Sequence, residues 1–253
     1  MQRGSVRKRI DKNDGRSRLP WSHTPGGWGG AEYHGTSGGS TRTPVVFVHG
    51  NRSGADTWRT HAEDLLATGT TGDDVWAINF SSKTPSHDQM ASELEEFVSA
   101  LRSYTGRDEV DIVAHSLGVT GVRWWMETRG GHRHVRRFIG IAGANHGMKI
   151  ATAAARLGVS SGPFGPAQFL RDDYSRFADH PLKRLNRSPE VPEDVTAFTV
   201  LGKRDRLFAG SKRSPLLANA ERNVALDTGH SGSKNSARAR KLILSLLCRP
   251  DSE

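Results

Sequence analysis

Short apolar runs alternate with amphipathic segments along most of the chain. The apolar runs are rich in β-branched residues and end at a glycine or a polar residue, which is typical of buried parallel strands. The amphipathic segments repeat apolar residues at intervals of three and four, which predicts helices packed on a sheet. Strands are predicted at 44–50, 75–80, 110–114, 137–142, 194–200 and 223–227, and helices at 56–67, 86–101, 118–128 and 234–247. This alternation predicts an α/β fold with a single, doubly wound and mostly parallel sheet flanked by helices.

Two regions depart from the alternation. Residues 1–42 are polar, rich in Gly, Ser and Arg, and show no period, so we expect a basic N-terminal extension of loops ahead of a domain over residues 43–249. Trp21 and Trp28 are candidates to hold the second half of this extension on the domain. The longest interruption covers residues 146–193. Since an insertion after a strand of such a sheet lies over the ligand crevice, we expect a modest substrate-covering cap, with a passive surface excursion as the alternative.

The charge of the chain is concentrated near its start. The formal net charge is +9, and residues 1–18 hold seven basic and two acidic residues, which gives +5 there and leaves +4 for all the rest. No aromatic residue is interleaved with these basic ones, so the extension offers no platform on which bases could stack. We therefore expect a solvated tail and no nucleic-acid partner; an anchor for an anionic surface is the alternative.

Length and cysteine content suit one domain without covalent cross-links. A chain of 253 residues buries enough surface to fold alone, and the single cysteine, Cys248, excludes an internal disulfide. No apolar run is long enough to span a membrane. The basic first residues are not followed by an apolar segment, so they are not an intact signal peptide. We expect a secreted monomer whose leader has been removed, with a cytoplasmic protein as the alternative.

The segment Ala114-His-Ser-Leu-Gly118 carries the main chemical signal. It resembles the G-x-S-x-G nucleophile elbow, with alanine at the first position. The elbow is a sharp strand-to-helix turn that exposes a serine hydroxyl at a helix N-terminus, where developing negative charge is favoured. The motif here follows a predicted strand and precedes a predicted helix, as that mechanism requires. Ser116 is therefore the candidate nucleophile.

A serine nucleophile needs a histidine base and an acid that orients it. In this architecture they follow the serine in the order acid, then histidine. His230 comes directly after the last predicted strand, and Asp205 follows the strand before it, so both are predicted at the carboxyl edge of the sheet. The rival candidates, which fit this placement less well, are His132, His134, His146, His180 and Asp227.

The negative oxygen formed during acyl transfer needs two backbone N–H donors. One is expected from Leu117, the residue after the nucleophile, and the other from Asn51, in the loop after the first predicted strand. His49 and His115 lie beside these donors. We interpret both histidines as packed supporting residues and assign them no chemistry.

At this point the chain resembles a known family. The segments VVFVHGN (45–51), VDIVAHSLGV (110–119) and IAGANHG (141–147) are similar to the class 2 lipase group of the α/β-hydrolases, over roughly residues 43–249. That group includes small bacterial lipases with little or no lid and extracellular polyhydroxybutyrate depolymerases. The resemblance implies the α/β-hydrolase fold and ester hydrolysis through an acyl-enzyme, without a cofactor.

The resemblance also assigns roles. It places the catalytic triad and the oxyanion donors on Ser116, Asp205, His230, Asn51 and Leu117. Depolymerases of this type have glycine after the asparagine, where this chain has Arg52, so a long cation beside the oxyanion loop bears on the depth of the acyl site. The further substrate contacts that we expect come from the insertion and are Phe164, Phe169 and Tyr174. No pair of histidines has the spacing of metal ligands, so no catalytic metal is expected.

Three functions compete at this stage. The favoured one is a lipase or esterase acting on small-molecule or polymeric esters, with polyester depolymerisation as a variant. The second keeps the fold and the triad but acts on a thioester or an amide, or transfers the acyl group to an acceptor other than water. The third is a non-catalytic binding protein that uses the basic extension. Epoxide hydrolases and dehalogenases of this fold are disfavoured, because they use aspartate where this chain has Ser116.

Overall fold

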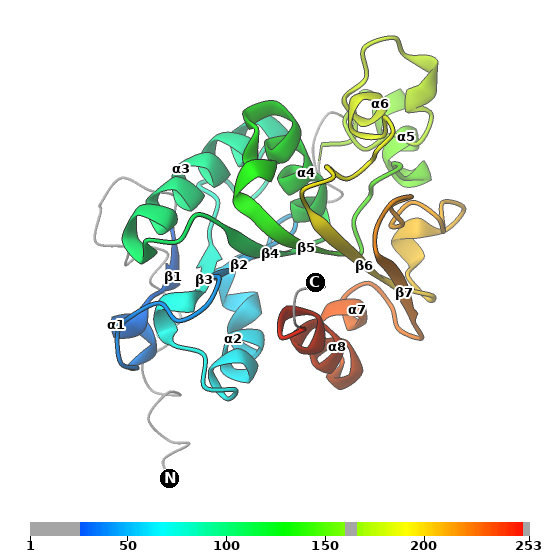
Figure 1. The fold of residues 1–253 in the computed structure, drawn as a ribbon. Helices are drawn as coiled ribbons and strands as arrows, with labels where there is room; N and C mark the ends of the chain where they lie inside the picture. The colour runs from blue at the N-terminus through cyan, green and yellow to red at the C-terminus, as the bar shows by residue number, and fades with distance from the viewer. Residues whose placement is uncertain (1–25, 160–165, 250–253) are drawn as a thin grey trace.

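A computed structural model describes residues 26–159 and 166–249, and it contains one seven-stranded sheet in the order β1-β3-β2-β4-β5-β6-β7 (Figure 1). β1 runs antiparallel to β3, and the other neighbours are parallel. The strands are β1 Gly27–Gly29, β2 Val45–Val48, β3 Val75–Ile78, β4 Val110–His115, β5 Val135–Ile141, β6 Thr196–Gly202 and β7 Arg222–Leu226. The predicted fold class is confirmed, and each of the six predicted strands is present within a few residues of its predicted position.

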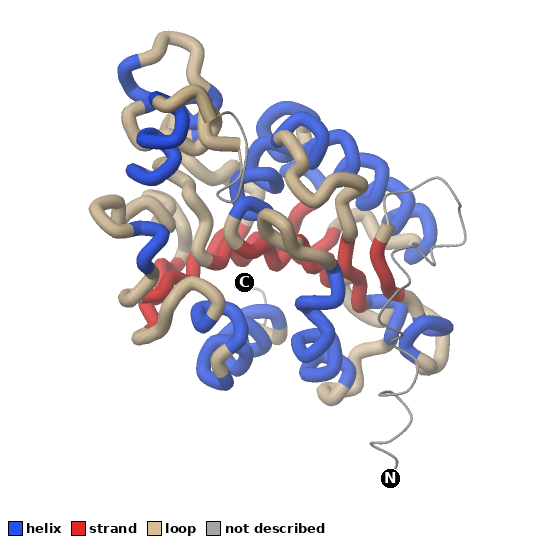
Figure 2. The backbone as a smooth tube through the Cα atoms, turned by 180° about the vertical axis from the view of Figure 1, so that it is seen from behind, coloured by secondary structure: helices blue, strands red, loops and turns tan. Residues whose placement is uncertain are grey.

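Helices cover both faces of this sheet. They are α1 Ala31–His34, α2 Arg59–Leu66, α3 His87–Thr105, α4 Leu117–Arg129, α5 Lys149–Arg156, α6 Pro181–Leu185, α7 Gly232–Asn235 and α8 Ala237–Leu247. α3 and α4 lie on one face and α2 and α8 on the other, and the view from behind shows the sheet between these two layers (Figures 1 and 2). Within the described part of the chain, no helix has the length and apolar character needed to cross a membrane.

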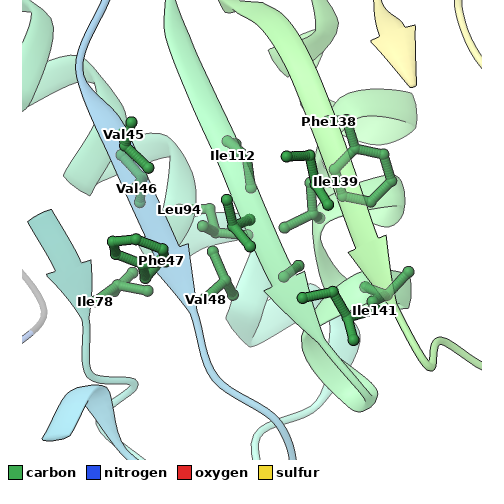
Figure 3. Close-up of a cluster of buried hydrophobic side chains, with 14 of the residues drawn as sticks. Val45, Val46, Phe47, Val48, Ile78, Leu94, Ile112, Phe138, Ile139 and Ile141 are labelled. Carbon is green, nitrogen blue, oxygen red and sulfur yellow. The ribbon is translucent and has the colours of Figure 1, made fainter. Parts of the chain in front are cut away.

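The centre of the sheet is the core of the molecule. All four residues of β2 are buried, and so are Ile112 on β4 and Ile139 on β5, which lie beside them in Figure 3. Strands covered by helices on both faces bury both sets of side chains, which explains why these segments are continuous apolar runs. Phe47 is fully buried, so truncating it to alanine would cost about 3–5 kcal/mol of stability.

The second half of the N-terminal extension is part of the fold. Residues 1–42 were expected to be loops, and this is wrong over β1 and α1, where Trp28 is buried as predicted. Both elements are too short to show a period in the sequence. Gly27 is present because the strands are close: a Cβ atom there would lie 2.1 Å from the carbonyl oxygen of Ala77. Trp21 lies outside the described residues.

The insertion over residues 146–193 contains α5 and α6, which lie together beyond one end of α4 (Figure 1). A buried guanidinium on α4 anchors it. Arg123 donates to the carbonyl oxygen of Leu185 at 2.6 Å and to Asn186 Oδ1 at 3.1 Å. Burial lowers the pKa of Arg123 to about 10, so the side chain is still charged at neutral pH. The insertion is therefore fixed to the helix that begins at the candidate nucleophile.

Candidate active site

Three strands bring one residue each to the same edge of the sheet. Ser116 follows β4, Asp205 follows β6 and His230 follows β7. Because parallel strands end at one edge, residues far apart in the sequence meet there. Ser116 Oγ lies 3.0 Å from His230 Nε2, and His230 Nδ1 lies 2.6 Å from Asp205 Oδ2. The structure thus brings the three predicted residues into one continuous chain of hydrogen bonds.

The backbone at Ser116 has the strained geometry of a nucleophile elbow. Its φ of 56° and ψ of −123° are uncommon for a residue with a side chain, and such strain costs on the order of 1–3 kcal/mol. Close neighbours enforce the turn. A Cβ atom on Gly118 would lie 2.5 Å from the carbonyl oxygen of His49, and one on Gly50 would lie 2.9 Å from Ser116 Cβ. Ala114, at the first elbow position, is fully buried and its methyl group is accommodated.

Asp205 is held in place by a second contact. Its Oδ1 atom accepts a hydrogen bond from the backbone N–H of Leu207 at 3.0 Å, while its Oδ2 atom faces His230. The side chain caps the short 3₁₀ helix η6, Arg206–Phe208, and is only 1% exposed. With both carboxylate oxygens engaged, the acid can turn neither away from the imidazole nor toward solvent.

The rival residues have partners elsewhere. His132 Nδ1 lies 2.8 Å from Asp194 Oδ2, and Asp227 forms an ion pair with Arg204 on the surface. His146 is hydrogen bonded to a glutamate in a separate cavity, described below. None of these contacts joins a rival residue to the hydroxyl of Ser116.

The two predicted oxyanion donors lie beside Ser116, the candidate nucleophile. Leu117 is the first residue of α4, where backbone N–H groups have no partner within the helix, and the helix dipole favours negative charge. Asn51 follows Gly50, which is packed against Ser116. Asn51 and Leu117 both line the cavity that contains Ser116 and His230.

That cavity, called here the serine cavity, has a volume of about 200 Å³. Most of its wall is apolar. Its lining residues are Asn51, Ser116, Leu117, Ala142, Ala144, Met148, Leu170, Leu207, Phe208 and His230. Met148 and Leu170 come from the insertion over 146–193, so part of the insertion does form a wall of the site.

The other predicted substrate contacts lie elsewhere. Phe169 stacks face to face on the buried ring of His87, and the hydroxyl of Tyr174 accepts a hydrogen bond from Asn186 Nδ2 at 3.1 Å. The backbone N–H of Arg52 donates to the carbonyl oxygen of Lys83. Phe164 lies outside the described residues. The structure does not bring the described three to the wall of the serine cavity.

Sequence reasoning missed the apolar residues that do line it. Leu207 and Phe208 come two and three residues after Asp205, so their proximity to the acid was a usable signal. Met148 and Leu170 gave no such signal, because they meet through a bridge between two loop segments of the insertion, Met148 with Arg171.

The two histidines beside the donors are packed, as predicted. His49 Nδ1 lies 2.8 Å from the carbonyl oxygen of Gly50, and its Nε2 accepts a hydrogen bond from the backbone N–H of Phe80. Burial lowers the pKa of His49 and holds the pKa of His115 well below its ordinary value. Both rings are therefore neutral near pH 7, and the ring centre of His115 lies 4.8 Å from that of His230.

A second, more open cavity of about 540 Å³ is called here the His146 cavity. Seven of its ten lining residues have polar or charged side chains; the ten are His146, Asp172, Glu190, Gly210, Ser211, Lys212, Arg213, Ser214, Leu216 and Ala218. His146 Nε2 lies 2.9 Å from Glu190 Oε1. Across the described residues, no group of three or more histidine, cysteine or acidic side chains is arranged to hold a metal ion.

The mostly parallel sheet with helices on both faces is the α/β-hydrolase fold. Residues 42–161 match the family model described as lipase (class 2), which confirms the resemblance found in the sequence over that part of the chain. Among solved structures, the chain is similar to lipase B of Aspergillus fumigatus, with a TM-score of 0.63 at 16% identity over 82% of this chain and 52% of that one. It is also similar to the lipase BlEst2 of Bacillus licheniformis in its propeptide form, with a TM-score of 0.60 at 15% identity over 84% of this chain and 52% of that one.

The carboxylesterase CesB (YbfK) of Bacillus subtilis is also similar, with a TM-score of 0.51 at 15% identity over 83% of this chain and 85% of that chain. At such identities the likeness establishes the fold. This chain spans about half the length of the two lipases.

Proposed function

We propose that this protein is a serine hydrolase that cleaves carboxylic esters through Ser116, His230 and Asp205. The observation that carries the proposal is the continuous contact from hydroxyl to imidazole to buried carboxylate, at 3.0 and 2.6 Å, placed on a strained turn at a helix N-terminus. The class 2 lipase match over residues 42–161 supports an ester as the bond that is cleaved.

The mechanism follows from the placement of these groups. His230 takes the proton of Ser116 as the hydroxyl oxygen attacks the ester carbonyl carbon. The backbone N–H groups of Leu117 and Asn51 stabilise the oxyanion, and Asp205 stabilises the imidazolium. His230 then gives the proton to the departing alcohol, which leaves an acyl-enzyme. Water, deprotonated by His230, attacks the acyl carbon, and the acid is released with regeneration of the Ser116 hydroxyl.

The serine cavity favours a short acyl group. At about 200 Å³ it is smaller than the roughly 300–1,000 Å³ of typical ligand pockets, and its wall is mainly apolar. Met148 and Leu170 from the insertion limit its extent. A short acyl chain would bury its methylene groups there, whereas a long chain would have to leave the cavity. A polyester with short repeat units would offer the same acyl group, so depolymerisation is a variant of the same reaction.

The test is the hydrolysis of p-nitrophenyl esters from acetyl to palmitoyl. Wild type should show a maximum at a short chain, and Ser116→Ala should lose several orders of magnitude in kcat. Ser103→Ala, an exposed serine on α3, is the matched control and should behave as wild type. Equal rates for Ser116→Ala and wild type would refute the assignment. A maximum at palmitoyl would refute the short-acyl preference alone.

A further inference from the structure

A buried lysine lies close in the sequence to the proposed base. Lys234 lies in α7, four residues after His230, and is 5% exposed. Its Nζ atom donates to the carbonyl oxygen of Thr57 at 3.0 Å and lies 4.4 Å from the ring centre of Trp58. In the described parts of the chain, no carboxylate lies within ion-pair distance of this ammonium group.

Such a group costs stability. Removing an ammonium ion from water costs several kcal/mol even after the surroundings relax. The carbonyl of Thr57 and the ring of Trp58 offset only part of this cost. Burial lowers the pKa of Lys234 to about 8, so the side chain is still mostly protonated at pH 7. A methionine of similar size could fill the same space without this cost. Groups that burial perturbs in this way gather at functional sites.

The contacts of Lys234 join two parts of the site. Thr57 and Trp58 belong to the 3₁₀ helix η2, Ala55–Trp58, which begins four residues after Asn51. On the other side, Ser233 Oγ donates to the carbonyl oxygen of His230 at 2.5 Å, so the turn that holds Lys234 also holds the base. The ammonium group therefore connects the segment of the base with the segment that follows an oxyanion donor.

We propose that Lys234 is a positioning residue of the active site, whose buried ammonium group fixes the His230 segment against the segment that follows Asn51. The proposal rests on the proposed hydrolase function. It assigns Lys234 no contact with substrate. A shift of the imidazole by about 1 Å relative to the hydroxyl is enough to lower a rate by about 100-fold.

Lys234 interacts electrostatically with groups on four neighbouring segments. Asp56 of η2 favours its charge. The charge of Lys234 in turn helps to lower the pKa of His61 on α2, of His49 after β2 and of His115 on β4, all of which burial already keeps neutral. Lys234 is therefore the group in this cluster that changes charge above neutral pH. As the pH rises through about 8, the ammonium loses its proton and its attraction to Trp58, and the positioning weakens.

The decisive variant is Lys234→Met, with Lys241→Met on the exposed face of α8 as the matched control. Three quantities are measured: kcat and KM on p-nitrophenyl butyrate, the rate at which a fluorophosphonate probe labels Ser116, and the melting temperature. We expect kcat and labelling to fall roughly 10- to 100-fold with KM nearly unchanged, because the serine cavity is intact. The melting temperature should stay the same or rise, because a buried charge has been removed. Lys241→Met should match wild type in all three.

Wild-type kcat for Lys234→Met would overturn the proposal. A lower rate together with a clear drop in melting temperature would also overturn it, because the lysine would then only hold the fold together.

The pH dependence of the labelling rate gives a second test, and its wild-type measurement does not depend on the folding of a variant. The wild-type labelling rate should fall between about pH 7 and 9.5, and Lys234→Met should lack that fall. A flat wild-type rate over this range would overturn the proposal. Labelling of Ser116 without hydrolysis of any ester would refute the ester substrate and still test Lys234. If Ser116 is not labelled and no ester is hydrolysed, the proposed hydrolase function and the positioning role of Lys234 are both refuted.

Discussion

The serine cavity and the His146 cavity both contain a histidine in contact with a carboxylate. The distances are similar, 2.6 Å from His230 to Asp205 and 2.9 Å from His146 to Glu190. The difference lies at the other ring nitrogen. In the serine cavity it faces a hydroxyl at 3.0 Å, whereas His146 Nδ1 lies 3.3 Å from the backbone carbonyl oxygen of Ser214. Only the first arrangement offers a nucleophile whose proton the imidazole can take.

This comparison shows that neither cavity size nor a histidine–carboxylate pair identifies the site. The His146 cavity is the larger and the more open one. What distinguishes the serine cavity is a hydroxyl on a strained turn, next to the N-terminus of helix α4. The two cavities are neighbours along the chain, since His146, Asp172 and Gly210 each lie two residues from a residue that lines the serine cavity.

The largest effect should separate the two histidines. His230→Ala removes the proposed base and should lower kcat on p-nitrophenyl butyrate by about 10³-fold or more. His146→Ala removes an imidazole whose two nitrogens contact a carboxylate and a backbone carbonyl, and should stay within about threefold of wild type. Steady-state kinetics of the two variants, with circular dichroism to confirm folding, makes the comparison. A large kcat loss in His146→Ala with an intact fold would place the chemistry in both cavities.

An intermediate effect is expected when a leucine is truncated in the wall of the serine cavity, but not when one is truncated in the wall of the His146 cavity. Leu207→Ala enlarges the serine cavity and should move the preferred acyl chain to a longer ester. The value of kcat/KM should change by about tenfold for each methylene group by which the chain differs from the preferred length. Leu216→Ala makes the same truncation in the wall of the His146 cavity and should leave the chain-length profile unchanged. The measurement is kcat/KM across the p-nitrophenyl series. The same shift in both variants would mean that acyl chains enter the polar cavity as well.

The smallest effect concerns stability and pH. Burial raises the pKa of Glu190, but hydrogen bonds from His146 and from the backbone N–H of Ala218 outweigh it, so the pKa lies below its ordinary value. A lowered carboxyl pKa stabilises the fold above the unfolded-state pKa, and this stability is lost as the pH falls through the folded-state pKa.

Glu190→Gln should therefore remove about 0.2–1 kcal/mol at pH 7, the range of partly exposed ion pairs, and less in acid. Urea unfolding at about pH 7 and about pH 4 measures it. A destabilisation that is larger at the acid pH would contradict this sign.

The six parallel strands, the helices α2, α3, α4 and α8 and the elbow at Ser116 could be predicted, because each is a local pattern with its own period or spacing. α5 and α6 were missed. The order of acid and base along the chain then selected Asp205 and His230, since the sheet brings the ends of its parallel strands to one edge. β1 was missed because three residues show no period. Phe169 and Tyr174 were assigned to the substrate site because aromatic character is visible in a sequence and its orientation is not.

The sequence by itself determined the class of fold, the strained serine turn and the residues able to serve that serine. Only the tertiary structure decided which apolar side chains enclose it, and that Lys234 is buried against Thr57 and Trp58. The contacts of Lys234 with Thr57 span 177 positions, and those of Ser116 with His230 span 114. Hydrophobic periodicity reports the face of one element toward its neighbours over a few residues. Hydrophobic periodicity does not indicate which distant segments enclose a cavity, because this depends on how the helices and loops pack on the folded sheet.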